Sequence, residues 1–435
     1  MTAFGRFVAD VRAAGRLVLQ PRMGFGDAAH MRRGLAATKT AAPATVGTIT
    51  LDSYTRLGDH DGARRMLAAG VELNGYPIVA HDAGTTLAML DGIRDDAFPV
   101  QVRHGSPTPD RLFRRLCDLG LTATEGGPVS YCLPYGRTPL RESRRSWERC
   151  CRMLADTGES GVEPHLETFG GCMLGQLCPP GLLVAISVLE ALFFRRYGLR
   201  SVSLSYAQQA SPAQDHEALH ALRHLGDRFL SGLDWHIVLY AYMGLYPRTR
   251  SGAEALLADA AGLAVRGGAT RLIVKTTAES ARIPTIAENV AALRHAASAA
   301  HDAATSVMYD AAVYDAAASV AQNARVVAPP ASDTGVLAEA TAIVEAVLDL
   351  DDDVGKAMER AFRRGYLDIP YCPHPDNAGR TSSYLDHDDR LRWRDTGRLP
   401  VAEPRRAAGR HFGTADLLEC LTRVRRKYDP IEVST

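Results

Sequence analysis

Short apolar, β-branched runs alternate with longer amphipathic stretches over roughly the first 270 residues of the chain. The runs have the length and composition of β-strands. The stretches between most of them have a helical period, as in 109–120 and 179–198. This alternation predicts an α/β protein with a parallel sheet. Nine segments qualify as strands: 16–22, 46–52, 76–80, 98–103, 120–124, 163–168, 200–205, 235–241 and 270–276.

The positions of the polar residues favour a barrel over an open sheet. Polar side chains follow the candidate strands all along the chain, as in a (β/α)8 TIM-type barrel, whose active sites form at the carboxyl ends of the strands. An open sheet that binds a dinucleotide would carry a GxGxxG turn after its first strand, and this sequence has none there. We therefore expect an eight-stranded barrel, so one of the nine candidates must lie outside it.

We divide the chain into two parts. Residues 1–330 are expected to form the catalytic barrel and its flanking helices, including an alanine-rich helical stretch at 286–326. Residues 331–435 are expected to form a helical and irregular C-terminal extension packed on the barrel. Within it, 335–365 reads as an acidic helix. The turn-forming residues of 368–400 suit a segment that wraps the barrel or lines its mouth.

Composition argues against several kinds of partner. Lys and Arg together number 50, as do Asp and Glu, which disfavours binding to nucleic acid or to an anionic membrane. No run approaches the ~18–20 apolar residues of a membrane span, and the N-terminus lacks the apolar core of a signal peptide. The eight scattered cysteines indicate reduced thiols in a cytoplasmic protein. Segments such as HDAGTT, DHDD and CPHPD lack the spacing of zinc sites, so we expect no metal site.

Three arginines, Arg22, Arg56 and Arg103, stand at the ends of apolar runs. Only four of the fifty basic residues are lysines, so arginine is common here and position rather than type singles these three out. In one parallel barrel their guanidiniums would face one mouth, where each can hold a carboxylate through two hydrogen bonds. Cations buried together without anions are costly. They therefore indicate either a dianionic ligand or local pairing with acids such as Asp52 and Asp59.

Further candidates fall at the same predicted mouth. His104 directly follows Arg103 and could donate into the mouth or cap a loop. Glu125, before two glycines, suits a ligand ammonium or a proton, and the competing interpretation is a buried salt bridge to one of the arginines. Tyr131 and Tyr135, in SYCLPY, could bind a carboxylate or simply pack. Together with the arginines, this set fits a substrate with two carboxylates and one ammonium, an acidic amino acid.

Lys275 ends the apolar run RLIVK in a chain nearly devoid of lysine, and Glu279 follows four residues later. One interpretation is a simple ion pair between positions i and i+4, worth about 0.2–0.5 kcal/mol. The other is a functional need for a compact ammonium, for example in a Schiff base.

Several motifs occur in the order and with the spacing of one known family, from about residue 16 to 400: QPRMG (20–24), DSYTR (52–56), NGYP (74–77), QVRHG (101–105), EGG (125–127), SYCLPY (130–135), MGLYP (243–247), VKT (274–276), IPT (283–285) and DIP…NAGR (368–380). The chain resembles the larger, epsilon-type subunit of glutamate mutase (methylaspartate mutase), an adenosylcobalamin-dependent isomerase. Two segments depart from the family pattern. LYAYMGLYP (239–247) has Tyr246 in place of phenylalanine, and ETFGGCMLG (167–175) replaces an EPFGPLTG-like run.

The resemblance implies a role for each matching residue. Expected substrate contacts are a three-arginine claw on the carboxylates, a carboxylate that meets the ammonium, and further polar contacts: Arg22, Arg56, Arg103, Glu125, His104, Tyr131 and Tyr135. Expected adenosylcobalamin contacts are Gly24, Asn74, Pro134, Tyr246, Lys275, Glu279 and Ile283. Lys275 and Glu279 match positions near the adenosyl ribose, which disfavours the Schiff-base interpretation.

The resemblance also implies a reaction and a partner. The reaction is the radical interconversion of L-glutamate and L-threo-3-methylaspartate. In the family the corrin is held by a small separate subunit with a DxHxxG motif, and none of the 14 histidines here lies in such a motif. We therefore expect a barrel subunit, a homodimer within a heterotetramer, that works with a small cobalamin-binding subunit. The alternatives are a paralogous mutase for another acidic substrate and a non-catalytic homologue that binds an amino acid or serves in assembly.

Overall fold

Eight parallel strands form one sheet in the order β1-β8-β7-β6-β5-β4-β3-β2, so β1 and β2 are its two edge strands. The computed structural model describes residues 3–134, 136–161, 163–170, 177–314, 333–402 and 412–429. The strands are β1 (Val18–Pro21), β2 (Gly47–Thr50), β3 (Val100–Arg103), β4 (Ala123–Glu125), β5 (His165–Glu167), β6 (Ser201–Ala207), β7 (Asp234–Tyr240) and β8 (Arg271–Val274). The predicted TIM-type barrel is confirmed.

The barrel closes along a short seam between β1 and β2. One isolated parallel bridge joins Leu19 to Thr45. There the Leu19 N–H donates to the Ala44 carbonyl at 2.9 Å, and the Val46 N–H donates to the Leu19 carbonyl at 3.1 Å. By contrast, β6 and β7 pair continuously over their whole lengths. The seam is therefore paired over a shorter length than the joint between β6 and β7.

The candidate strand 76–80 is the one that lies outside the barrel. Its only β-type pairing is an isolated bridge between Tyr76 and Leu51. Pro77 has no N–H to donate to a ladder, and the Ile78 N–H turns back to the Tyr76 carbonyl at 3.0 Å. Tyr76 and Ile78 are nevertheless fully buried, which accounts for the apolar pattern that made the segment resemble a strand.

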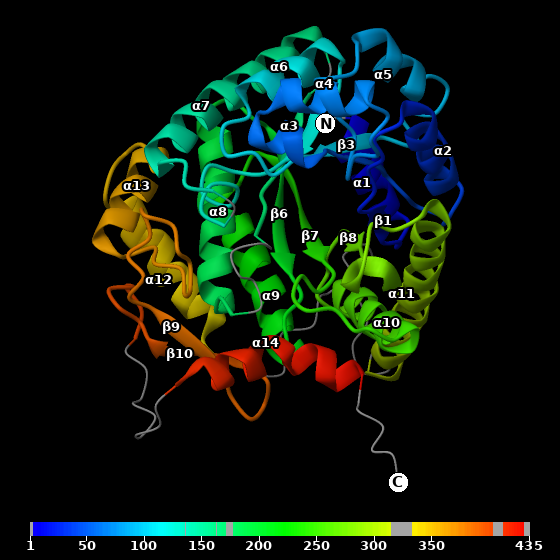
Figure 1. Cartoon of the computed structure of the whole chain (residues 1–435). Helices are drawn as coiled ribbons and strands as arrows, with labels where there is room; N and C mark the ends of the chain where they lie inside the picture. The colour runs from blue at the N-terminus through cyan, green and yellow to red at the C-terminus, as the bar shows by residue number, and fades with distance from the viewer. Residues whose placement is uncertain are drawn as a thin grey trace.

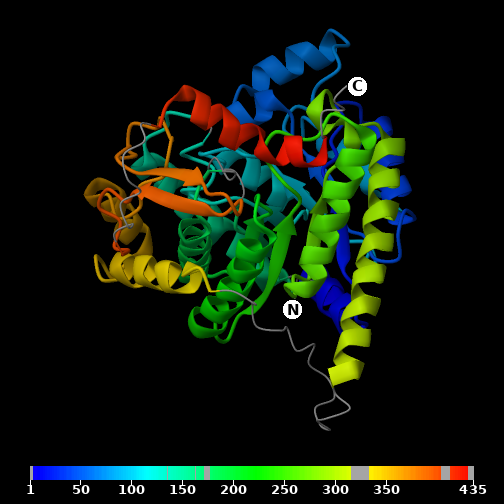
Figure 2. The ribbon, with the colours of Figure 1, turned by 90° about the horizontal axis from the view of Figure 1, so that it is seen from below.

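Helices surround the barrel (Figure 1). Between β1 and η2 they are α2 (Ala28–Lys39), α3 (Ser53–Leu57), α4 (His60–Ala68), α5 (Ala83–Leu90), α6 (Asp110–Asp118), α7 (Leu140–Asp156), η1 (Thr157–Ser160), α8 (Pro180–Arg196), α9 (Pro212–Phe229), α10 (Arg250–Arg266) and η2 (Thr277–Ser280). The next, α11 (Ile286–Tyr314), packs along α10 (Figure 2). The rest of the predicted 286–326 stretch lies outside the described residues. Helix α8 is apolar on nearly all of its faces, and nearly all of its residues are buried, as expected for a helix of that composition.

An amino-terminal helix, α1 (Ala3–Ala13), closes the barrel at the amino ends of its strands. The Phe4 ring stacks on His165 with centroids 4.9 Å apart, and the Arg271 guanidinium lies 5.0 Å from the centre of the same ring. Phe4, Val8 and Val11 pack with Val18 and other residues at this end. The opposite, carboxyl end of the barrel is where the loops carry the candidate site.

The C-terminal residues differ from the sequence prediction in two places. The acidic segment 335–365 forms two helices, α12 (Val336–Leu348) and α13 (Val354–Arg364). The chain turns between them because the Asp353 carboxylate caps α13, accepting from the Lys356 N–H at 3.1 Å. The stretch 368–400 contains a hairpin, β9 (Ser382–Leu385) and β10 (Leu391–Asp395).

The last described helix, α14 (Thr414–Tyr428), crosses beside α10 (Figure 2). Its Val424 packs in one cluster with Tyr242 and Tyr246, which follow β7. The C-terminal part of the chain thus reaches the carboxyl end of the barrel, while α12 and α13 cover α8. None of the described helices is long and apolar enough to cross a membrane. The seven cysteines in the described ranges are free thiols.

Candidate active site

A cavity of about 250 Å³ opens at the carboxyl end of the barrel, among the loops that follow β1 to β5. Its walls hold all three predicted arginines and three of the other predicted substrate contacts. The lining residues are Arg22, Thr50, Ser53, Arg56, Leu57, Arg103, His104, Gly105, Glu125, Tyr131 and Phe169. Tyr135 lies outside the described residues. Residues far apart in the sequence therefore meet at one mouth.

The three arginines have different surroundings. Arg103, at the end of β3, is buried, and its Nη2 lies 2.7 Å from Glu125 Oε2. Arg22, just past β1, is one-third exposed, and its Nη1 lies 3.4 Å from Glu279 Oε2. Arg56 lies within α3 rather than at the end of β2, and it is half-buried. Among the described residues Arg56 has neither an ion pair nor a hydrogen bond to its side chain.

The acids suggested as local partners of the arginines have other contacts. The Asp52 carboxylate caps α3 by accepting from the Thr55 N–H, and the Asp59 carboxylate caps α4 by accepting from the Gly62 N–H at 2.8 Å. Neither forms an ion pair with Arg56. Two carboxylates from more distant loops, those of Glu125 and Glu279, approach the arginine cluster instead.

Glu125 forms the salt bridge that competed with a ligand role for it. Besides Arg103, its carboxylate faces two phenols: Tyr131 donates to Oε1, and the Tyr240 hydroxyl lies 3.1 Å from Oε2. Burial raises the pKa of Glu125, the nearby Glu167 raises it further, and the Arg103 charge opposes both without cancelling them. A buried carboxylate held in this way can meet a cation or accept a proton.

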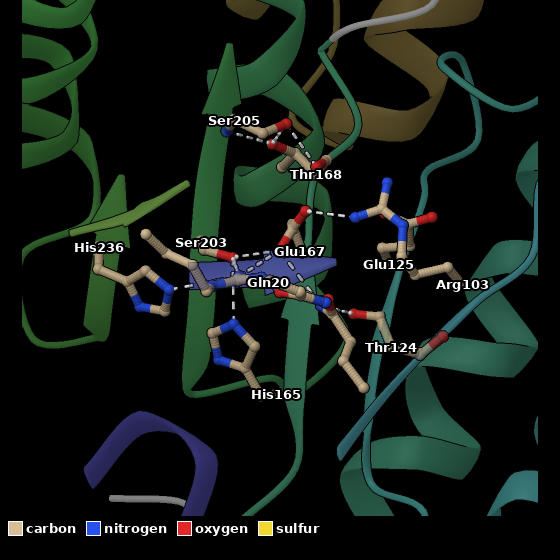
Figure 3. A network of polar contacts seen from close by, with 12 residues as sticks. Gln20, Arg103, Thr124, Glu125, His165, Glu167, Thr168, Ser203, Ser205 and His236 are labelled. Carbon is tan, nitrogen blue, oxygen red and sulfur yellow. Dashed lines mark hydrogen bonds and ion pairs between the residues drawn. The ribbon is translucent and has the colours of Figure 1, made fainter. Parts of the chain in front are cut away.

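Glu167, Tyr240 and Arg271 belong to the same arrangement and were missed in the sequence. Glu167 Oε1 lies 3.9 Å from Arg103 Nη1 (Figure 3). The same oxygen accepts from the Tyr240 hydroxyl, while Oε2 accepts from Arg271. Burial alone would raise the pKa of Glu167, but Arg271 and Arg103 outweigh it and hold this pKa below its ordinary value. Glu167 is therefore ionised and links Arg103, at the cavity, to an arginine deep in the barrel.

Neutral polar side chains fill the barrel below Glu167. Gln101 Nε2 donates to Glu167 Oε2 at 3.2 Å, and Gln20 Nε2 donates to Gln101 Oε1 at 2.7 Å. His165 contacts Ser203 at 3.1 Å, and burial lowers the pKa of His165 to about 3, so its ring is neutral. Figure 3 shows Gln20, Ser203 and His165 gathered beside Glu167. The two buried guanidiniums are thus balanced by two carboxylates and surrounded by amides, hydroxyls and imidazoles.

His104 caps a loop and also lines the cavity. Its Nδ1 accepts from the Ser106 N–H at 3.0 Å, and its ring packs on Trp147 and Tyr131. Burial lowers the pKa of His104 to about 3, so the ring is neutral and its proton must sit on Nε2. Nε2 is buried, and a contact with the Glu125 backbone partly opposes the lowering of the His104 pKa.

Glu190 of α8 supports the loop that carries Tyr131. Its Oε1 accepts from the N–H groups of Val129 and Ser130, both at 2.9 Å. Gly127 lies directly against this carboxylate, since a Cβ built there would come 2.1 Å from Oε1. Burial raises the pKa of Glu190 to about 7. This carboxyl group therefore positions the Gly-Gly loop from below.

The residues expected to contact the cofactor follow several strands round the mouth. Lys275 Nζ lies 3.6 Å from Glu279 Oε2, so the simple i,i+4 ion pair is present. The same carboxylate oxygen also holds Arg22. Lys275 Nζ lies 5.1 Å from the centre of the Tyr246 ring, whose hydroxyl is buried without a hydrogen-bond partner among the described residues. These four side chains therefore form one contact group across the loops after β1, β7 and β8.

The remaining four candidate cofactor contacts are more peripheral. Asn74 is exposed, and its Oδ1 accepts from the Ser53 N–H at 2.9 Å, while Ile283 is exposed and Pro134 half-buried. Gly24 is buried against the Thr50 carbonyl, where an added Cβ would come within 2.1 Å. Its glycine identity therefore has a packing reason in this fold.

The DHDD segment forms the turn between β9 and β10. Asp386, His387 and Asp388 place potential ligand atoms within 4.8 Å of one another. Asp386, however, accepts from the N–H groups of Asp388 and Arg390 and pairs with Arg392. These contacts are those of an aspartate that closes a hairpin turn.

The sequence matches the family model described as Methylaspartate mutase E chain (MutE) over residues 1–411. The chain belongs to the methylaspartate mutase E chain family. Three relatives are each described as a glutamate mutase epsilon subunit. That of Yersinia enterocolitica is 29% identical over 411 residues, which cover 92% of this chain and 81% of the relative. That of Escherichia coli O157:H7 is 28% identical, with 89% and 79% covered. That of Halobacterium salinarum is 30% identical, also with 89% and 79% covered.

Membership of this isomerase family gives the cavity a context. In this E chain the cavity lies where active sites of (β/α)8 barrels form, at the carboxyl ends of the strands. The altered segment 167–175 lies partly outside the described residues, and 239–247 contributes Tyr240 and Tyr246 to the mouth.

Proposed function

We propose that this chain is the catalytic subunit of an adenosylcobalamin-dependent mutase that interconverts L-glutamate and L-threo-3-methylaspartate. The observation that carries the proposal is the convergence of Arg22, Arg56 and Arg103 on one cavity in a member of the E chain family. The substrate is inferred from the charge of that cavity, from its unsatisfied donors and from the family.

The charges around the cavity favour a ligand with two carboxylates. Arg22, Arg56, Arg103 and Lys275 contribute four cations, and Glu125 and Glu279 contribute two carboxylates. This leaves an excess of two positive charges. L-Glutamate would supply two carboxylates to the arginines, while its ammonium would approach Glu125.

Two arginines at the cavity have donors without an acceptor among the described residues. The Arg56 guanidinium is unpaired, and the buried Arg103 Nη1 has no hydrogen-bond partner. A buried donor without an acceptor costs about 1–3 kcal/mol. An anionic ligand that accepts from Arg103 Nη1 would remove this cost, which supports carboxylate binding at this place.

The mouth also suits adenosylcobalamin. Leu57, Leu245 and Ile283 expose apolar side chains there, with exposed fractions of 79%, 42% and 48%. Glu279 contacts both Arg22 and Lys275, and the side chains of Lys275 and Glu279 can bind the hydroxyls of a ribose. Such a mixed rim fits a broad, partly apolar ligand with a polar arm.

The chain itself would bind the substrate, orient it and shield it from water. Bound adenosylcobalamin supplies the carbon-centred radical that removes a hydrogen atom from the substrate. The arginines would fix the carboxylates, Glu125 would fix the ammonium, and the closed barrel floor would keep water away. A small separate subunit with a DxHxxG motif would hold the corrin, because none of the 14 histidines of this chain lies in such a motif.

The test is reconstitution. The purified chain is mixed with a small cobalamin-binding mutase subunit, adenosylcobalamin and L-glutamate, and 3-methylaspartate is followed by proton NMR. We expect product that requires all four components. Arg56→Ala serves as a matched inactive control, because this half-buried arginine has no ion pair or hydrogen bond to lose among the described residues. Product from another acidic substrate alone would identify a paralogous mutase. Saturable L-glutamate binding without any product would identify a binding homologue.

A further inference from the structure

A second cavity, of about 330 Å³, lies between α7 and α13, and shares no lining residue with the cavity at the mouth. Its walls carry six cationic side chains and one carboxylate. The lining residues are Arg141, Arg144, Arg145, Lys356, Glu359, Arg360 and Arg363. The chain as a whole has equal numbers of acidic and basic residues, so this excess of positive charge is local.

Only part of this charge is neutralised. Arg144 is buried and forms two ion pairs. One is with Glu359, and in the other its Nη1 lies 3.1 Å from Glu148 Oε2. Arg360 pairs with Asp351 at 2.7 Å. The pair between Arg144 and Glu359 joins α7 to α13, and so fixes the two helices with their cations facing one cavity.

Four cations lack an acidic partner. Across the described ranges, Arg141, Arg145, Lys356 and Arg363 form no ion pair. All four are exposed at the rim of the cavity. An adjoining cavity of about 460 Å³ is lined by three arginines of α7 and one carboxylate, those of Arg141, Arg145, Arg149 and Glu142, and so extends the mainly cationic surface along α7.

The arrangement along α7 is unfavourable without an anion. Arg141, Arg145 and Arg149 follow one another at four-residue intervals, so like charges stack on one helix face, which destabilises a helix. Of the three, Arg149 is paired, with Asp110. Elsewhere the same spacing joins opposite charges, as between Arg250 and Glu254.

The helix ends add to the positive potential. Arg141 is the second residue of α7, and Lys356 is the third residue of α13. Both stand in first helical turns, where the helix dipole favours anions and opposes cations. The cavity thus combines four unpaired cations with two helix ends of the same sign.

We propose that this cavity binds a small phosphorylated molecule with at least two phosphate groups, such as a nucleoside diphosphate or inorganic pyrophosphate. Guanidinium forks match phosphate oxygens in pairs, and adjacent phosphates supply enough charge for cations on both helices. A single carboxylate would leave most of the four unpaired. The site lies outside the proposed mutase site and does not depend on that function.

The experiment measures binding of inorganic pyrophosphate to the full chain by isothermal titration calorimetry in low-salt buffer. The test variant is Arg145→Gln with Lys356→Gln, which removes one unpaired cation from each helix. The matched control is Arg6→Gln with Arg33→Gln, which removes two exposed arginines from α1 and α2, outside the cavity. Melting temperatures without ligand establish that each variant is folded.

We expect one saturable site in the wild type, a dissociation constant raised at least about tenfold in the test variant, and a change below about twofold in the control. Affinity should fall with added salt, since the site is exposed. Equal weakening in both variants would show non-specific surface charge and overturn the proposal. So would the absence of saturable binding, or binding only of an acidic protein such as the partner subunit.

Discussion

Arg103 Nη2 lies 2.7 Å from Glu125 Oε2, so the innermost arginine of the cavity already has a carboxylate partner. In the proposed function, a substrate carboxylate would use the remaining part of the guanidinium, where Nη1 is the atom without a hydrogen bond. That role would depend on the geometry of the guanidinium and not only on its charge. This distinction leads to the first prediction.

Arg103→Lys should lower kcat/KM for L-glutamate at least about a hundredfold in the reconstituted enzyme, because an ammonium cannot serve Glu125 and a substrate carboxylate through one planar fork. Steady-state kinetics would measure this. Arg33→Lys, an exposed arginine on α2, is the matched control and should be neutral. Near-normal turnover in Arg103→Lys would contradict the claw.

Tyr240→Phe should both destabilise the chain and impair the site. Its single hydroxyl proton serves either Glu125 or Glu167, two buried carboxylates that face each other across it. Its loss leaves an acceptor unsatisfied, and we expect about 1–3 kcal/mol less unfolding free energy in urea and a lower kcat. Tyr242→Phe is the control, because the Tyr242 hydroxyl makes no hydrogen bond recorded in the described structure. Equal unfolding free energies and kcat values for the two variants would show that the Tyr240 hydroxyl does not bridge Glu125 and Glu167.

Glu190→Gln should change how stability depends on pH. Burial raises the pKa of Glu190 to about 7, so between about pH 4 and pH 7 the folded chain holds a proton that the unfolded chain releases. The contribution of Glu190 to stability is therefore present at low pH, falls as the pH rises and levels off above the folded pKa.

Relative to wild type, Glu190→Gln should gain unfolding free energy between pH 5 and pH 8, by on the order of 1–3 kcal/mol. Urea unfolding at several pH values would measure it. Glu142→Gln, at an exposed position on α7, should show no such trend. A pH-independent difference for Glu190→Gln would mean that this carboxyl group does not titrate in the folded chain.

Glu279→Gln should weaken cofactor binding more than substrate binding. Glu279 holds both Arg22, at 3.4 Å, and Lys275, at 3.6 Å, and so fixes two loops at the mouth. We expect the apparent dissociation constant of adenosylcobalamin to rise about tenfold in the presence of the partner, by titration followed in the visible spectrum. Glu288→Gln, in the nearby surface pair with Arg282, is the control. An unchanged cofactor affinity would separate Glu279 from the cofactor site.

The sequence predicted much of the barrel and the convergence at its mouth, because both follow from local patterns. Each strand of the barrel had an apolar run, whereas the strands β9 and β10 of the C-terminal hairpin were not predicted. The wrong strand at 76–80 arose because the buried Tyr76 and Ile78 give that segment the apolar pattern of a strand. Arg22 and Arg103 lie at strand ends as expected, whereas Arg56 lies on a short helix, whose length no apolar pattern sets.

The inner layer of the site could not be derived in the same way. Arg271 was not among the predicted site residues, and its carboxylate partner, Glu167, lies 104 residues away in the sequence. A signal was nevertheless present: charged residues inside the short strands β5 and β8, where a buried charge requires a counter-charge. The division of 335–365 into two helices depended on the capping contact of Asp353, which a helical period does not reveal.

The seam between β1 and β2 has a consequence for the energy of the whole barrel. Arg22 follows β1 and Arg56 follows β2, so the two arginines lie on opposite sides of a joint that is paired over a shorter length than the joint between β6 and β7. A dicarboxylate bound by both arginines would link the two edge strands across this joint. Local opening, which allows amide hydrogen exchange, would then be suppressed first at this seam. Binding of the substrate would then also stabilise the barrel against local opening.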